Sequence, residues 1–511
     1  MNKTAFGGLL LIVLATAFLV RIPGLSLRPM HHDEANQALK FGRLLEKGEY
    51  QYDKADHHGP ALYYLTLPLA WASSKTTLSS LDETTLRLLP AIFGAALVLL
   101  LLLFGQSLGR TACLFAGLFI ALSPAFTYYS RFYIQETLFV FFIMGFIGSL
   151  WRYRTRPAIG WGLAAGFFAG MMYATKETSI IIFIAAAGAL LLSDIFRKKD
   201  IPAPGRSSKA LLTHILLALI AAALTAALFF SSFFRNPKGI LDSVLAFQDY
   251  LTKSGEPGFH AHSLWYYLGL LTYSKSAGLV WGEALVMTLA CLGILSALKN
   301  RGPFPVFISS YTLFTTAVFS VISYKTPWNA LPFYIGFVIL AGIGTVFILQ
   351  SLRKNYQKIL IGLLLAAGII NLEGQSYEAN FRYYADPRNP YVYAQTSTDF
   401  LKLVRRVEET AALHPDHERM LIKVVCGPYE TWPLPWYLRR YERVGYWPDW
   451  RDVGGFDDAL LIIASQDQAE KIRPAIHDKF QSEYYGLRPD VLLTLFIRND
   501  LWDLFMKDKR Q

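Results

Sequence analysis

The chain has 511 residues, 53% of them hydrophobic and 17% charged, and its 49 basic and 38 acidic residues give a net charge of +11. Soluble domains carry roughly a quarter charged residues, so this composition argues against a soluble enzyme and against a disordered chain. Three cysteines are too few for a disulfide scaffold. The basic excess would suit nucleic acid, but in so apolar a chain it must first be examined as membrane topology.

Apolar runs near the ~20 residues that cross a bilayer recur through the first three quarters of the sequence. They predict a polytopic α-helical membrane protein with about eleven transmembrane helices, at 5–25, 87–108, 111–129, 136–153, 158–175, 178–196, 211–234, 277–298, 304–323, 329–351 and 357–372. A shorter apolar run at 60–74 contains Pro68. Runs of that length are more often interfacial or re-entrant than spanning.

The basic residues predict the orientation of these spans. With eleven spans, alternate loops contain fifteen basic residues and only two acidic ones, Asp194 and Asp200. Such an excess of basic residues marks the cytoplasmic face. We therefore expect a multi-pass protein of the cell (plasma or inner) membrane, with a cytoplasmic N-terminus and an extracytoplasmic C-terminal region. The net charge then reflects orientation, and no nucleic-acid partner is expected. The fifteen bases are Lys3, Arg110, Arg152, Arg154, Arg156, Arg197, Lys198, Lys199, Arg206, Lys209, Lys299, Arg301, Arg353, Lys354 and Lys358.

The last part of the chain has the pattern of a soluble domain. An amphipathic helix is predicted over 399–413 and another near 466–476, and short buried strands are predicted at 420–425, 459–464 and 491–497. We therefore divide the chain into a transmembrane domain, 1–372, whose first outer loop spans 26–86, and a small extracytoplasmic α/β domain, 373–511.

Unusual polar residues gather in the five loops that this topology places outside. A charge at a bilayer edge is costly, so clustering on one face suggests a site. The simpler reading is that Arg131, Lys176 and Lys325 reach the interface individually, within a belt of aromatic residues. The first outer loop contains HHDEAN at 31–36 and DHHGP at 56–60, the second (130–136) reads SRFYIQE, the third (175–178) reads TKET, the fourth holds His260, His262 and WYY at 265–267, and the fifth (324–329) reads YKTPWN.

These groups suit transfer of a sugar from an anionic, lipid-linked donor. Asp33 or Glu34 could act as general base on an acceptor hydroxyl, and single displacement fits better than a hydrolase pair because the two carboxylates are adjacent. Cationic side chains would bind the donor phosphodiester and stabilise the leaving charge: Lys325, Arg131, Lys176 and His58. Trp265 and Trp328 offer aromatic faces for sugar stacking, and His57 and Tyr324 would line the substrate.

A divalent metal is the competing use of the same loop. His31, His32, Asp33 and His57 could bind zinc or a harder ion. Their spacing matches no specific metal motif. Metal dependence is therefore left open.

At this point the motifs resemble the GT-C superfamily of membrane glycosyltransferases. The shared features are the Asp33-Glu34 pair, the HGPALY segment from His58, and Arg131 followed by Glu136. Together they look like the protein O-mannosyltransferases and the lipid A aminoarabinose transferases. HHDEA, HGP, TKET and YKTPW, with NPYVY at 389–393 and WPLPWY at 432–437, look most like the flippase-activity-associated family of archaeal-type glycosylation.

The resemblance implies that Asp33 is catalytic with Glu34 beside it, that Glu136 is a second acidic site residue, and that His58 and Lys325 approach a polyprenyl phosphate. Two positions depart from the usual pattern: Gly59 replaces the first proline of a pair, and Glu136 replaces the commoner aspartate. The implied partners are a polyprenyl-phosphate sugar, membrane lipid and an unidentified lipid, glycan or protein acceptor.

Two other functions fit parts of the sequence. The chain could be a transporter, or an accessory component, for lipid-linked sugar flipping; however, Glu283 and His214, the clearest titratable residues inside spans, lie nearer an end than the middle, which favours the enzyme. A glycan receptor would use Trp432 and Trp436 as stacking platforms, although tryptophans also fill the core of small domains.

Overall fold

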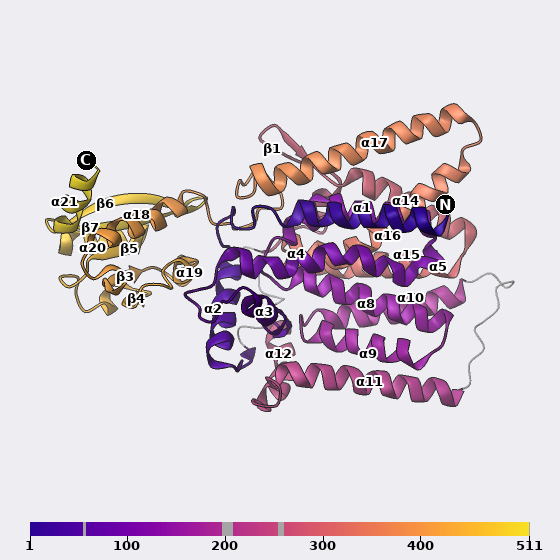
Figure 1. The fold of residues 1–511 in the computed structure, drawn as a ribbon, viewed down its shortest axis with the longest axis horizontal. Coiled ribbons are helices and arrows are strands. Elements are labelled where there is room, and N and C mark those ends of the chain that lie inside the picture. Colours follow the sequence, from indigo (N-terminus) through magenta and orange to yellow (C-terminus); the bar gives the residue numbers. More distant parts are fainter. Residues whose placement is uncertain (55–57, 197–207, 254–259, 510–511) are drawn as a thin grey trace.

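The computed structural model describes residues 1–54, 58–196, 208–253 and 260–509. Long helices lie side by side in one bundle, and a smaller sheet-containing unit stands at one end of it (Figure 1). A helix coincides with each of the eleven predicted spans: α1 (Lys3–Arg21), α4 (Glu83–Leu100), α6 (Arg110–Leu122), α8 (Glu136–Thr155), α9 (Ile159–Tyr173), α10 (Ser179–Ile195), α11 (Ser208–Phe230), α14 (Ala284–Asn300), α15 (Pro303–Val321), α16 (Leu331–Ser351) and α17 (Asn355–Tyr377).

Within the described residues, six helical segments are long and apolar enough to cross a membrane: Lys3–Arg21, Glu83–Leu108, Lys209–Phe230, Pro303–Val321, Pro327–Ser351 and Asn355–Arg382. The number of crossings therefore stays a prediction. α16 lies at the centre, with most of its side chains buried. It packs closely on α14 because Gly293 and Gly344 leave no side chain between the two backbones.

Two shorter helices cover the end of the bundle nearest the sheet. α2 (His32–Lys47) runs across the direction of the long helices, and α3 (Ala61–Ala72) lies beside it (Figure 1). α3 has 12 residues with Pro68 inside it, so it is too short to span a bilayer. Both helices belong to the predicted first outer loop, 26–86. Further short elements include α7 (Pro124–Tyr129), α12 (Lys238–Lys253), α13 (Tyr266–Thr272), the strand pair β1 (Ser274–Ser276) and β2 (Leu279–Trp281), and the 3-10 turn η3 (Pro327–Ala330).

The C-terminal residues form a five-stranded sheet in the order β4-β3-β5-β7-β6. β4 (Val444–Trp447), β3 (Ile422–Val425) and β5 (Leu461–Ser465) are parallel, whereas β7 (Val491–Arg498) and β6 (Phe480–Arg488) are antiparallel to their neighbours. α18 (Phe400–Leu413), α20 (Gln466–Ile476) and α21 (Asn499–Asp508) accompany it. The predicted strands correspond to β3, β5 and β7; β4 and β6 were not predicted, because their partly exposed residues lack an uninterrupted apolar run.

A connector, residues 389–396, seats this unit against the first outer loop. The Gln395 side chain donates to the Pro29 carbonyl at 2.8 Å, and the Thr396 hydroxyl donates to the Met30 carbonyl at 2.8 Å. From the sheet side, the Tyr437 hydroxyl accepts the Met30 N–H at 2.9 Å. The backbone just before the predicted catalytic residues is thus held by residues 366 and 407 positions later in the chain.

Candidate active site

The five predicted outer loops meet at the end of the bundle that carries α2. The first loop bonds the second through Glu34 and the Tyr133 N–H, and the third through His58 and Glu177. The third loop bonds the fifth through Lys176 and Asn329. The fifth bonds the fourth through Lys325 and the His262 carbonyl. The expectation that these polar loops gather in one place is confirmed.

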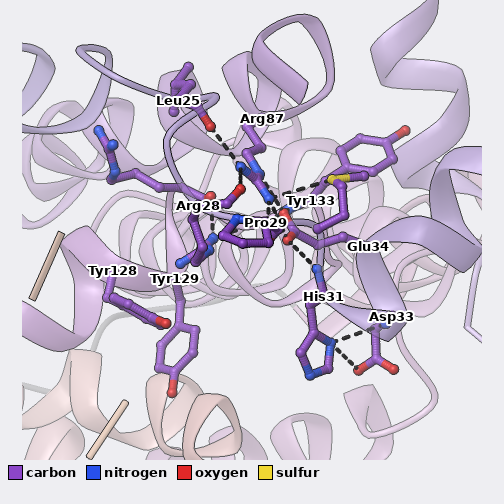
Figure 2. Close-up of polar contacts among 12 residues, drawn as sticks. Leu25, Arg28, Pro29, His31, Asp33, Glu34, Arg87, Tyr128, Tyr129 and Tyr133 are labelled. Carbon is purple, nitrogen blue, oxygen red and sulfur yellow. Dashed lines mark hydrogen bonds and ion pairs between the residues drawn. The ribbon is translucent and has the colours of Figure 1, made fainter. Parts of the chain in front are cut away.

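Glu34 is an anchor at the start of α2. Its carboxylate receives Arg87 Nε at 2.7 Å on one oxygen and Arg87 Nη2 at 2.7 Å on the other, and both side chains are fully buried. It also accepts the Tyr133 N–H at 2.8 Å and the His31 N–H at 3.1 Å. Figure 2 shows Glu34 turned toward Arg87, away from Asp33. A carboxylate that accepts this many hydrogen bonds has a structural role.

Electrostatics fix Glu34 in its charged form. Burial alone would raise the pKa of this carboxyl, but the charges of Arg87 and Arg28 and the hydrogen bonds from Arg87 and Tyr133 outweigh it and lower the pKa to about 2. A base with so low a pKa accepts a proton poorly at neutral pH. Of the two adjacent carboxylates, the geometry leaves Asp33 as the stronger candidate base.

Asp33 lies in the first turn of α2 with its side chain 44% exposed. Its N–H donates to His31 Nδ1 at 3.1 Å, and the carboxylate lies 3.8 Å from the same nitrogen. Because a backbone N–H can only donate, Nδ1 is the unprotonated nitrogen, and Nε2 donates to the Tyr393 carbonyl at 3.1 Å. His31 is therefore neutral, in agreement with the lowering of its pKa by burial.

Lys325 supplies a buried positive charge where the fourth and fifth loops meet. Its ammonium donates to the carbonyls of His262 at 3.0 Å and Ile322 at 2.6 Å, and neither acceptor is a carboxylate. The Lys325 N–H bonds the His260 carbonyl at 2.9 Å. Burial lowers the pKa of His260, although the charge of Asp33 opposes that change. Tyr324, 42% exposed, lies against the His260 ring with centroids 4.6 Å apart.

η3 joins two halves of the site. Trp328 contacts the His31 ring edge-on, with centroids 5.8 Å apart. Its neighbour Asn329 accepts from the Lys176 ammonium at 2.8 Å, and Lys176 donates to Glu136 at 2.7 Å. Lys176 and Glu136 are both buried, so each neutralises the other. The structure thus places Glu136 as the partner of Lys176.

His58 lies beside the third loop, where its Nδ1 donates to Glu177 at 3.2 Å. The preceding residues 55–57 lie outside the described residues, so the prediction for His57 has no structural counterpart here. Gly59 donates its N–H to the Thr175 carbonyl at 3.1 Å, and a Cβ at this position would collide with the Ala174 carbonyl. This close approach accounts for glycine where a proline is usual, because proline has no N–H to donate.

Of two further predicted residues, Arg131 uses its side-chain donors at the end of α1 and Trp265 is exposed. Arg131 donates to the carbonyls of Arg21, Pro23 and Gly24 at 2.6–2.8 Å, and its guanidinium lies over the Phe381 ring. Arg131 therefore holds the end of α1, and its guanidinium N–H groups bind backbone carbonyls. Trp265 precedes α13 and is 68% exposed.

The predicted metal ligands do not fit a metal well. Both ring nitrogens of His31 are hydrogen-bonded to the backbone, and the His32 ring packs on Trp432 with centroids 5.4 Å apart. Across the described ranges, no group of three or more histidine, cysteine and acidic side chains is arranged to hold a metal ion.

Four residues of this cluster were missed or left unassigned by the sequence analysis. Arg87 was counted as part of a span, and the buried partners of a carboxylate cannot be located from spacing. Asn329 and His260 lay in loops that the sequence singled out, but nothing in one sequence specifies their contacts. Tyr393 belongs to the NPYVY segment, and that segment was the one available signal.

Comparison with known proteins agrees with this architecture. A family model described as dolichyl-phosphate-mannose-protein mannosyltransferase matches residues 11–235. The structure is similar to that of ArnT from Cupriavidus metallidurans bound to undecaprenyl phosphate, with a TM-score of 0.63 at 15% identity over 97% of this chain and 98% of that one. The chain has the GT-C fold. It is a polytopic helical membrane protein, and its resemblance to the GT-C superfamily is confirmed.

Other GT-C structures align over nearly the whole chain. The oligosaccharyltransferase AglB from Archaeoglobus fulgidus, solved with an inhibitory peptide and a dolichol-phosphate, gives a TM-score of 0.56 at 13% identity over 98% of this chain and 77% of that one. The arabinofuranosyltransferase AftD from Mycobacteria gives 0.52 at 12% identity, over 98% of this chain and 40% of that one. No curated protein matches the sequence. The closer likeness to the flippase-activity-associated family stays a prediction.

Proposed function

We propose that this protein is a glycosyltransferase that moves a sugar from a polyprenyl-phosphate-linked donor to an acceptor hydroxyl at the outer face of the membrane. One observation carries the proposal: Asp33 is half-exposed at the meeting point of the five loops, whereas Glu34 and Glu136 are buried in ion pairs. A half-exposed carboxylate can reach a substrate hydroxyl, and a buried, paired one cannot without losing its partner.

The reaction is a single displacement with Asp33 as general base. The Asp33 carboxylate takes the proton of the acceptor hydroxyl while that oxygen forms a bond to the anomeric carbon. The bond between the anomeric carbon and the phosphate oxygen breaks, and polyprenyl phosphate leaves with a second negative charge. This reaction needs no further reactant, and it inverts the configuration at the anomeric carbon.

Lys325 is the best-placed residue to bind and stabilise the leaving phosphate. Its charge is compensated only by carbonyl dipoles within the described chain, so a phosphate would gain a strong partner there. His58, held by Glu177, is the second choice. Lys176 is already neutralised by Glu136, and it would act by orienting Asn329. Trp328 and Tyr324 would line the sugar.

The donor class rests on the relatives as well as on these charges. ArnT was solved with undecaprenyl phosphate and AglB with a dolichol-phosphate, and both share the fold of this chain. A polyprenyl phosphate would suit the end of the bundle where the five loops meet. The Lys325 ammonium would bind its phosphate, and the apolar helices α15 and α16, which end next to Lys325, would contact its polyprenyl chain. The acceptor is a lipid, a glycan or a protein.

The test uses purified full-length protein in lipid vesicles with radiolabelled polyprenyl-phosphate sugars and three acceptor classes. We expect transfer to one class, reduced at least tenfold by Lys325→Gln, which keeps hydrogen-bond donors but removes the charge. Lys471→Gln, at an exposed lysine of α20, is the matched control and should transfer normally. Translocation of the lipid-linked sugar without transfer to any acceptor would instead identify a flippase component.

A further inference from the structure

Tyr393 in the connector contacts three of the loops that build the candidate site. Its carbonyl accepts from His31 Nε2 at 3.1 Å. Its hydroxyl lies 2.8 Å from His260 Nδ1 and 3.3 Å from His262 Nε2. Its ring meets Trp328 edge-on, with centroids 5.8 Å apart. One residue from the segment before the sheet therefore joins the first, fourth and fifth outer loops.

The carbonyl of Tyr393 acts on the proposed base. By accepting from Nε2 it selects the His31 tautomer whose Nδ1 is unprotonated, and only that tautomer can accept the Asp33 N–H. His31 also caps α2, so its orientation fixes the first turn of the helix in which Asp33 lies. Tyr393 thus holds the Asp33 backbone in place through the imidazole ring of His31.

The hydroxyl of Tyr393 acts on the proposed phosphate-binding lysine. Burial raises the pKa of Tyr393 to about 12, so the hydroxyl keeps its proton and can donate to one ring while accepting from the other. The carbonyl of His260 accepts the Lys325 N–H, and the carbonyl of His262 accepts the Lys325 ammonium. Fixing both imidazoles therefore fixes the two carbonyls that hold Lys325.

We propose that Tyr393 is a positioning residue of the transfer reaction, which sets the Asp33 base and the Lys325 ammonium at a fixed separation by binding the histidines that hold each of them. This inference rests on the proposed function. It explains why the tyrosine, only half-buried, has polar partners on both its carbonyl and its hydroxyl. Base and cation must act on the same substrate at once, so small errors in their separation are costly in rate.

The first test is kinetic and uses a double-mutant cycle. Tyr393→Phe removes the hydroxyl and keeps the ring and the carbonyl, and we expect kcat to fall about tenfold with the KM for the lipid donor unchanged within about twofold. His260→Ala should give a similar loss, and the double variant should be no slower than the slower single variant. Tyr429→Phe, at a tyrosine 78% exposed in the sheet unit, is the control and should match wild type. A double variant whose fold-loss in kcat equals the product of the two single losses would overturn the proposal.

The second test does not depend on turnover. Hydrogen–deuterium exchange of the fourth and fifth loops should quicken in Tyr393→Phe, because the His262 N–H to Ser323 and the Lys325 N–H to His260 lose their support. Exchange in the bundle helices should be unchanged. If wild type transfers no sugar, the proposed function fails and the exchange result still decides the positioning role. Unchanged exchange at both loops would overturn it.

Discussion

Arg87 and Glu34 form a bidentate ion pair inside the protein, with Nε–Oε1 and Nη2–Oε2 both at 2.7 Å. Arg87 also donates to the carbonyls of Leu25 and Arg28 at 2.7 Å (Figure 2). One guanidinium on α4 therefore holds both the start of α2 and the loop that leads into it. Because Glu34 is bound in this way, the first turn of α2, which contains the preceding residue Asp33, is held in place.

Glu34→Gln should destabilise the protein more than it alters the chemistry. Removing one partner of a buried ion pair leaves an uncompensated charge, here on Arg87, and this costs about 3–5 kcal/mol. We expect a clear fall in the thermal unfolding midpoint in detergent, and loss of transfer in proportion to unfolded protein. A variant that unfolds like wild type but has lost transfer would mean that Glu34 takes part in the reaction.

The stability of the protein should decline as the pH falls below about 6.5, partly through His31. Burial lowers the pKa of His31, so below the ordinary value near 6.5 the unfolded chain binds a proton that the folded chain does not. His31 therefore contributes most above that pH, and its contribution is lost as the pH falls toward the folded pKa. His260 and His262 have lowered pKa values too and add to the same slope.

The comparison that isolates His31 is the thermal midpoint of wild type and His31→Asn between pH 7.5 and 5. Asparagine also caps helices but does not titrate in this range. The difference between the two midpoints should shrink or change sign as the pH is lowered. Two parallel curves would show that His31 takes up its proton equally in the folded and unfolded chains.

Gly59→Ala should separate the first loop from the third. A Cβ at this position would meet the Ala174 carbonyl, so the contact must open, and His58 would move away from Glu177. Overpacking of this kind costs about 1–3 kcal/mol. Gly188→Ala in α10 is the control, since a Cβ there meets nothing within 4 Å. We expect lower stability and weaker donor binding for Gly59→Ala alone, and equal behaviour of the two variants would contradict the close approach.

Local patterns predicted the helices well because long apolar runs and short buried strands are properties of neighbouring residues. The gathering of the five loops followed from counting alternate sides of the membrane. The resemblance favoured Asp33 over Glu34, but the different surroundings of the two carboxylates could not be predicted. Adjacent residues of a helix point about 100° apart, and their partners are distant residues such as Arg87. Arg131 appears from sequence to be a free outer-face cation, yet its partners are carbonyls at the end of α1.

The central claim is that Asp33 is the general base, and the initial rate of sugar transfer by Asp33→Asn tests it most directly. Asparagine has the same shape, and the side chain is half-exposed, so the thermal midpoint should match wild type. Loss of a general base lowers kcat by about 10²–10⁴-fold, and Glu470→Gln in α20 should leave it unchanged. We predict a folded Asp33→Asn protein that binds the polyprenyl-phosphate donor but transfers at least 100-fold more slowly; transfer by this variant at the wild-type rate would contradict the account.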